Sequence, residues 1–432
     1  GRRSDWQDLY SIAKKYYEAL LADPGNAQFH LTDPRGASDK SGRTFNNPYQ
    51  YFFEQMHMDD AIYADESIYE YPMQQGGGND GRPYSFGRPS SGGSKAAYPC
   101  KSYGQGRINP AYFYVVFDPN DMRRDVSITM TGSNGKGVEK LIPFVPNSKA
   151  EGGGLTLNKW DENRQANPWV AAQRKSGING PYMRMSEVYL GYAEVCAALG
   201  DVVTGKQYLK TVRERSFPQG LANTDAFIAS FGNDLVRAII EERGFEYAGE
   251  GDRRWTLIRS GYLPEDIKRI KDMTKAMMDG LATKGYYEFE NGNIISAYIW
   301  TKLVDAKTIY GHRLTAQCPT DKVNDPVLYP GWRGQKDNWE EMGLNYGSST
   351  PATNLAIKGL FEIVSEEEAA SLESQGYAKV NWGIDLVDYR DEYDKYLFWD
   401  YDYVSAPIYL WPFTPNVMAA GGFTNGYGFK QE

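Results

Sequence analysis

The segment from Glu241 to Arg254 holds the densest group of side chains that could perform acid–base chemistry. A glycoside hydrolase needs two carboxyl groups about 5–10 Å apart, one of them a general acid with a raised pKa. Three carboxylate pairs have the residue types for this role: Glu241/Glu242, Glu250/Asp252 and Asp400/Asp402. The first two pairs lie among arginines, which lower a carboxyl pKa and so oppose the role of a general acid.

We therefore interpret this charged segment as structural. Acids and bases three and four residues apart on a helix share one face and can form ion pairs. The sequence predicts one network that fastens this helix to its neighbours, with the members Glu241, Arg243, Glu246, Glu250 and Arg253. The pair Asp400 and Asp402 lacks a third acid at the spacing of a calcium loop.

Histidines and cysteines are few and widely separated: His30, His57, His312, Cys100, Cys196 and Cys318. Their number and spacing oppose a zinc site, a disulfide scaffold and a Ser-His-Asp centre. The glycine-rich stretch at 132–137 has two residues between its first glycines where a phosphate loop has four, so a hairpin turn is expected. We expect no catalytic residues, no metal and no cofactor, and therefore no enzyme.

Aromatic residues make up 14% of the chain, with 33 tyrosines and 10 tryptophans. Flat rings can stack on the apolar faces of sugars, while Asn and Arg side chains bind the hydroxyls. Rings and polar groups gather in loop-like sequence, where binding residues are common. The expected ligand-binding residues are Tyr71, Arg82, Tyr84, Phe86, Trp160 and Asn163, with Trp332 and Trp339 in reserve. Each ring could instead anchor a long loop to the core, and the sequence leaves this alternative open.

The bulk composition excludes two other classes of protein. A net charge of −9 opposes nucleic-acid binding, because a phosphate backbone needs a basic face. The sequence contains no apolar run close to the ~20 residues that span a bilayer.

The pattern of apolar residues predicts a mainly α-helical chain without a linker that would divide it into domains. Helices are expected at 5–22, 45–61, 181–199, 204–215, 225–247, 264–281 and 365–374, a strand at 68–71, a loop at 76–94, and a small β-hairpin from 126–130 and 138–142. Residues 181–283 form the expected helical core, built of tetratricopeptide-like pairs because Gly191, Ala193 and Ala197 let a partner helix approach closely. Residues 285–432 form an expected irregular, aromatic loop layer.

Five ordered motifs resemble the SusD-like (RagB/SusD) family, the nutrient-binding lipoproteins of Bacteroidota outer membranes. They are Asp65-Glu66-Ser-Ile-Tyr69-Glu70, Asp118-Pro-Asn-Asp121-Met-Arg123-Arg124-Asp125, Arg184-Met-Ser-Glu187 with Val212-Arg-Glu-Arg215, Glu241-Glu-Arg243-Gly-Phe-Glu246, and Leu410-Trp-Pro412-Phe-Thr-Pro415. The last motif departs from the family pattern, since Phe413 and Thr414 stand where Ile and Pro are expected.

The resemblance implies a SusD-like fold for residues 1–432 as one unit that lacks the family's N-terminal section and lipid-anchored cysteine. It also implies an outer-membrane, cell-surface protein that binds oligosaccharide without catalysis and delivers it to a TonB-dependent, SusC-like transporter. Its contact with the membrane would be through the lipid anchor alone. A peptide ligand is compatible with the family. The residues also leave open a glycan-cleaving hydrolase and a helical-repeat interaction scaffold.

Overall fold

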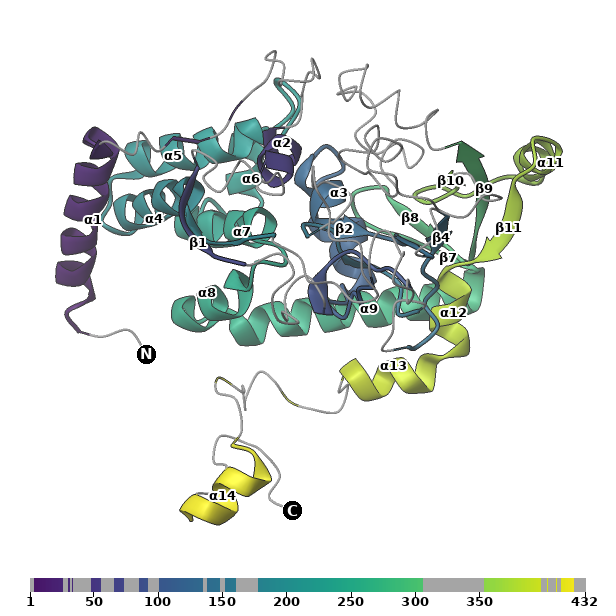
Figure 1. Cartoon of the computed structure of the whole chain (residues 1–432). Helices are drawn as coiled ribbons and strands as arrows, with labels where there is room; N and C mark the ends of the chain where they lie inside the picture. Colours follow the sequence, from purple (N-terminus) through teal and green to yellow (C-terminus); the bar gives the residue numbers. More distant parts are fainter. Residues whose placement is uncertain are drawn as a thin grey trace.

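The computed structural model shows a mainly α-helical fold, with most of the helices on one side and most of the short strands on the other (Figure 1). It describes residues 4–25, 30–31, 33, 48–55, 66–73, 85–91, 101–134, 138–147, 152–160, 178–305, 353–397, 402, 409 and 413–422. The predicted mainly α-helical class is confirmed. Among the described helices, none combines the length and the apolar character needed to cross a bilayer.

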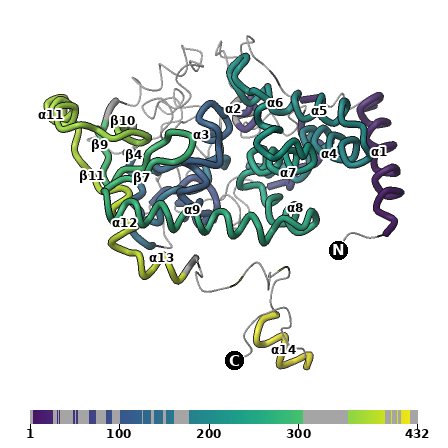
Figure 2. Tube along the Cα trace, turned by 180° about the vertical axis from the view of Figure 1, so that it is seen from behind, coloured from purple at the N-terminus to yellow at the C-terminus, as the bar shows by residue number. Residues whose placement is uncertain are grey.

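The helical side contains seven helices of the described chain. They are α1 (Trp6–Ala22), α4 (Met185–Ala198), α5 (Val202–Arg215), α6 (Thr224–Ala229), α7 (Leu235–Glu246), α8 (Asp252–Ser260) and α9 (Leu263–Lys284). The helices α4 and α5 pack as a close pair. Their contact leaves little room at Gly205, since a Cβ added there would lie only 3.0 Å from the Ala193 carbonyl oxygen. Ala193 and Ala197 therefore lie at this contact as expected, whereas Gly191 faces Tyr17 of α1. The tetratricopeptide-like arrangement stays a prediction. In both views α9 runs from α8 to α12 along one side of the molecule (Figures 1 and 2).

In the described part of the chain, the strands form five small antiparallel sheets. They pair as β1 (Ser67–Tyr71) with β6 (Gly180–Arg184), β2 (Ile128–Thr129) with β5 (Thr156–Leu157), β3 (Thr131–Ser133) with β4 (Glu139–Leu141), β7 (Tyr286–Glu288) with β8 (Ile294–Ser296), and β9 (Tyr298–Asp305) with both β10 (Thr353–Lys358) and β11 (Ala378–Asn381). The other helices that the structure describes are α2 (Pro48–Gln55), the π-helix η3 (Tyr112–Val116), α3 (Arg123–Ser127), α11 (Glu366–Ser374), α12 (Gly383–Asp388), α13 (Arg390–Leu397) and α14 (Pro415–Gly421).

Two sequence-based expectations need correction. The hairpin exists as β3–β4, with Thr131 opposite Leu141, but Val126 and Ser127 belong to α3, and β2 pairs with β5 instead. The region after residue 285 was expected to be irregular, yet it contains β7 to β11. The partner strands of β9 are separated from it by tens of residues, so local periodicity could not reveal them.

Aromatic side chains join the sheets to α9 in the largest core cluster. Trp382 is fully buried and donates its indole N–H to the Tyr114 hydroxyl at 2.8 Å. The Tyr114 hydroxyl in turn donates to the Leu360 carbonyl at 2.9 Å. Met277 and Leu281 of α9 pack in the same cluster. Each buried ring thus satisfies its polar end while contributing apolar area to the core.

The helix α7 lies at the centre of the helical side, and all its residues except Val236 are buried. Its charged side chains point in different directions, because an α-helix turns by about 100° per residue. Glu242 and Glu246 face one group of partners, Arg243 faces a second, and Glu241 faces a third. The five residues predicted as one network are therefore divided among three groups.

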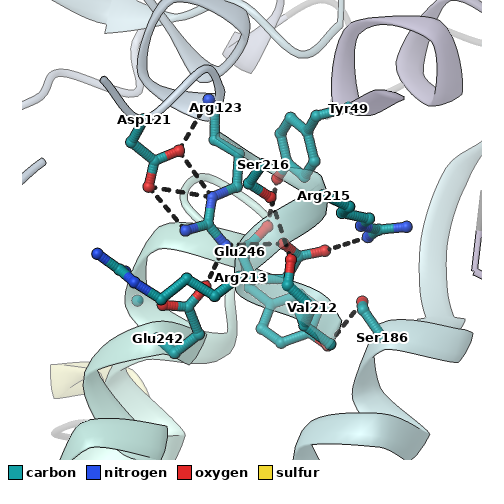
Figure 3. Close-up of polar contacts among 12 residues, drawn as sticks. Tyr49, Asp121, Arg123, Ser186, Val212, Arg213, Arg215, Ser216, Glu242 and Glu246 are labelled. Carbon is teal, nitrogen blue, oxygen red and sulfur yellow. Dashed lines mark hydrogen bonds and ion pairs between the residues drawn. The ribbon is translucent and has the colours of Figure 1, made fainter. Parts of the chain in front are cut away.

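The largest group, here called the central network, contains five carboxylates and five cations, all nearly withdrawn from water. Its members are Glu66, Asp121, Glu242, Glu246, Glu250, Arg123, Lys159, Arg184, Arg213 and Arg215. Figure 3 shows Arg123 between Asp121 and two residues of α7, Glu242 and Glu246. Its formal charges cancel, which is how a buried ionic cluster avoids leaving an unpaired charge.

Glu246 is the centre of this network. It receives Arg123 at 3.0 Å, Arg215 at 2.7 Å and a close contact from Arg184. Burial alone would raise the pKa of Glu246, but these three guanidinium groups outweigh it and hold the pKa well below its ordinary value of 4.5. The carboxylate is therefore ionised over the whole range in which the protein is expected to be folded.

The other two groups extend the network outward. Arg243 pairs with Asp252 at 2.5 Å and with Glu187 at 3.5 Å. The Tyr247 ring lies between this group and the central network, with the guanidinium of Arg184 4.6 Å and that of Arg243 4.9 Å from its centroid. The third group ties α7 to α8 and α9 and contains Arg237, Glu241, Arg253, Asp266 and Arg269.

We expect Glu246→Gln to lower the free energy of unfolding by roughly 3–5 kcal/mol, because three buried arginines then share one carboxylate fewer. Asp272→Asn is a matched control, since the Asp272–Lys268 pair on α9 is exposed and should contribute less than about 1 kcal/mol. Urea unfolding of both variants measures the difference. Similar losses in the two variants would contradict a structural role for the central network.

The lowered pKa of Glu246 also predicts how stability depends on pH. A carboxyl whose folded-state pKa is depressed stabilises the fold above its unfolded pKa, about 4.3, and this contribution is lost as the pH falls toward the folded-state value. Melting temperatures between about pH 7 and about pH 3 should fall more steeply for the wild type than for Glu246→Gln. Parallel curves would show that Glu246 does not drive the acid loss of stability.

Candidate functional site

The acids of the central network do not have the properties of catalytic groups. Glu242 and Glu246 are fully buried, and each is held by two or more arginines. The low pKa of Glu246 is the opposite of what a general acid requires. Within the described parts of the chain, no group of three or more His, Cys, Asp or Glu side chains could hold a metal ion. The central network therefore has a structural role, because it fixes the positions of the elements that carry its charged residues.

The feature of the described surface best suited to binding is a group of three exposed tyrosines on the β1–β6 sheet, here called the tyrosine surface. Tyr69 is 56% exposed, Tyr71 50% and Tyr182 66%. The rings of Tyr69 and Tyr182 meet edge to face, with centroids 5.6 Å apart. Tyrosines at alternate positions of one strand point to the same side of a sheet, which explains why Tyr69 and Tyr71 are exposed together.

The tyrosine surface is anchored to the central network at one end of the sheet. Glu66 directly precedes β1, Arg184 ends β6, and their side chains pair at 2.9 Å. The backbone N–H of Met185 donates to the Glu66 carbonyl at 2.8 Å. Because these groups are buried and paired, the strands that carry the tyrosines are held rigidly at this end.

The other end of the sheet is held by Asn179. Its side-chain amide donates to Glu70 at 3.0 Å, and its carbonyl oxygen accepts the backbone N–H of Met73 at 2.9 Å. Burial raises the pKa of Glu70, while the hydrogen bond from Asn179 opposes this rise. The two strands are thus joined beyond their own ladder.

The predicted ligand-binding residues have different environments. Tyr71 is exposed on β1, and Phe86 is 42% exposed beside Gly106. The ring of Trp160 was expected to be exposed, but it is only 3% exposed and packs with Leu157 and Ile178. Trp160 therefore supports the segment that leads into β6, and its predicted stacking on a ligand stays untested.

The other predicted ligand-binding residues, Arg82, Tyr84, Asn163, Trp332 and Trp339, lie outside the described residues. Sequence reasoning did not select Tyr69 and Tyr182 as binding residues. The alternation Tyr69-Glu70-Tyr71 is a signal for the first, because it places both rings on one side of a strand. Tyr182 carried no comparable signal, since its strand was read as the start of a helix.

The chain is similar to one family of proteins and to several solved structures. A family model described as the SusD family matches residues 28–413. No curated protein matches the chain.

Several solved structures are similar to this chain. A surface glycan-binding protein A from Bacteroides thetaiotaomicron, in complex with laminarihexaose, has 20% identity and a TM-score of 0.39, covering 60% of this chain and 52% of its own. A SusD homologue from the same organism has 18% identity and a TM-score of 0.39, covering 62% and 51%. NanU from B. fragilis has 18% identity and a TM-score of 0.38, covering 63% and 53%. The matched part of this chain spans about half the length of these structures.

The family model covers most of the 432 residues, including the segments that supply the acids and arginines of the central network. The chain belongs to the SusD family.

Proposed function

We propose that this chain binds an oligosaccharide at the cell surface and passes it to a TonB-dependent, SusC-like transporter of the outer membrane. In this proposal the protein is held at the membrane by a lipid anchor and catalyses no reaction. Membership of the SusD family supports the proposal at the level of class. The observation that carries it to this chain is the tyrosine surface on the β1–β6 sheet.

The chemistry of that surface suits a sugar. The C–H faces of a pyranose can lie on exposed rings, and a stacked ring contributes roughly 0.5–1.5 kcal/mol beyond the area it buries. The phenol hydroxyls of Tyr69, Tyr71 and Tyr182 can exchange hydrogen bonds with sugar hydroxyls. Three neighbouring rings suit a ligand of more than one sugar unit, since one monosaccharide covers about one ring.

The anchoring of the sheet adds to affinity by reducing the cost of binding. Loops that must become ordered lose conformational entropy when a ligand binds. Here the strands are held by Glu66 and Arg184 at one end and by Asn179 at the other. A ligand on this surface would therefore meet rings whose backbone is already in place.

We expect Tyr71→Ala and Tyr182→Ala each to weaken glycan binding severalfold or more while leaving the melting temperature nearly unchanged, because both side chains are at least half exposed. Isothermal titration calorimetry against an oligosaccharide panel that includes laminarihexaose measures the affinity. Tyr16→Ala is the matched control, since Tyr16 on α1 is 72% exposed and lies on a different element.

The oligosaccharide panel, a peptide library and an assay for released sugars together separate the proposal from its alternatives. Binding only to members of a peptide library would make the ligand a peptide, and release of shorter sugars would make the protein a hydrolase. Clean negatives for glycan and peptide alike would favour an interaction scaffold. Glycan binding that is unchanged in both tyrosine variants would remove the tyrosine surface from the proposal.

Trp160→Ala tests whether that ring supports the site or touches the ligand. Its burial against Leu157 and Ile178 predicts a loss of roughly 3–5 kcal/mol in the free energy of unfolding, as for other large-to-small changes in a core. Thermal unfolding and calorimetry on the same samples separate the two roles. A normal melting temperature with weakened binding would restore the predicted stacking role.

A further inference from the structure

A cavity of about 520 Å³ lies away from the tyrosine surface, between α9, α12, α13, the segments 105–110 and 144–147, and Gly153. Its volume falls within the range of about 300–1,000 Å³ that is typical of small-molecule sites. In both views α13 runs beside the end of α9 that leads to α12 (Figures 1 and 2). No residue of the β1–β6 sheet lines this cavity.

The walls of the cavity are mainly apolar. Phe144, Met277, Met278 and Leu386 supply large hydrophobic side chains, and Ile108 adds a fifth. Methionine side chains adapt to ligands of irregular shape, because they are unbranched and polarizable. Such walls favour an apolar ligand body, whereas a sugar would need many more polar partners.

Several polar groups of the lining already serve the protein. The Asn109 amide donates to the Thr274 hydroxyl at 2.8 Å, and its carbonyl oxygen accepts the backbone N–H of Ala111 at 2.8 Å. The Tyr393 hydroxyl donates to the Phe144 carbonyl at 2.5 Å. These bonds close the gaps between α9, α13 and the loops, and so shape the cavity.

Arg107 gives the lining its charge. Among the described residues that line the cavity there is one cation, Arg107, and no carboxylate. Burial lowers the pKa of the Arg107 guanidinium to about 10, with a smaller opposing effect from Tyr393. The group is still charged at neutral pH, and a guanidinium can bind an anion that enters the cavity.

The backbone around Arg107 is built to hold this side chain. The Ile108 N–H donates to the Leu155 carbonyl at 2.9 Å, and Arg107 forms an isolated antiparallel bridge with Thr156. Gly153 has φ of +89°, and a Cβ there would lie 2.7 Å from the Arg107 Nε. Only glycine therefore combines this backbone conformation with room for the guanidinium.

We propose that this cavity binds a small amphipathic carboxylate, whose carboxylate pairs with Arg107 and whose apolar body packs against Phe144, Met277 and Met278. A planar guanidinium can bind a carboxylate through two parallel hydrogen bonds, which fixes the orientation of the ligand as well as its charge. This site would be separate from the proposed glycan surface and does not depend on it.

The test compares acids with alcohols of the same shape. Octanoate and 4-phenylbutyrate are titrated by calorimetry into the wild-type protein, beside 1-octanol and 4-phenylbutan-1-ol. We expect at least one acid to bind, and to bind at least tenfold more tightly than its alcohol. Arg107→Gln should weaken the acid at least tenfold and leave the alcohol unchanged, while Arg107→Lys should weaken the acid less.

Arg390→Gln is the matched control, because it removes one positive charge from α13, where Arg390 pairs with Asp279 outside the lining. Gln105→Trp is a second test that leaves Arg107 in place. Gln105 is an exposed residue of the lining, so an indole there should narrow the cavity and abolish binding with a normal melting temperature.

Three results would overturn the proposal. They are acid binding weaker than about 1 mM for both probes, equal affinities for acid and alcohol, and unchanged acid affinity in Arg107→Gln. If Arg107→Gln does not fold, the acid–alcohol comparison and Gln105→Trp decide the question. Tyr71→Ala should leave acid binding intact, so failure of the glycan proposal and failure of this one are distinguishable.

Discussion

The removal of ten charged groups from water is the constraint on which the rest of this structure depends. Each buried carboxylate or guanidinium would be costly alone, and the cost is offset only when every charge has its partners in good geometry. Glu246 meets that condition through three arginines that come from α3, the end of β6 and α5. These elements are therefore fixed around α7 by a requirement of charge balance, in addition to the apolar contacts between α7 and α4 and α5.

This arrangement connects the interior to the surface. The pair Glu66–Arg184 belongs to the network and also closes one end of the β1–β6 sheet. Tyr182 stands only two residues before Arg184 in β6 and is already exposed, so the rigid interior and an accessible ring belong to one short strand. A binding surface of this kind needs little ordering when a ligand arrives, because its supporting groups are already fully paired.

Most of the helices could be predicted from the sequence, whereas the ion-pair partners of the charged residues on α7 could not. Small residues and apolar periodicity located α4, α5 and α9 to within a few residues, because these signals are local, and the helical segment predicted at 225–247 corresponds to both α6 and α7. The charges of α7 were assigned to one face by their spacing, whereas residues 241, 242 and 243 point to different neighbours. The burial of Trp160 could not be predicted for the same reason: it comes from Leu157 and Ile178, and the second of these is not adjacent in sequence. The ordered motifs around Glu66, Arg123, Arg184 and Arg215 were the available signal for the network, since they name the residues that meet at Glu246.

The central network also determines whether helices of the helical side could be removed or transplanted as independent units. Repeat proteins gain much of their independence from contacts between adjacent units, so pieces can be removed or transplanted. Here Glu246 depends on Arg123, and Arg215 depends on Glu66, across 123 and 149 positions of the chain. Closing such long loops is entropically costly and slows folding. In the helices from α4 to α9, excised without the segments around Glu66 and Arg123, the buried Arg215 would lose Glu66, and Glu242 and Glu246 would lose Arg123. They form a helical array in shape, but their buried charges are paired with β6 and with the segments around Glu66 and Arg123.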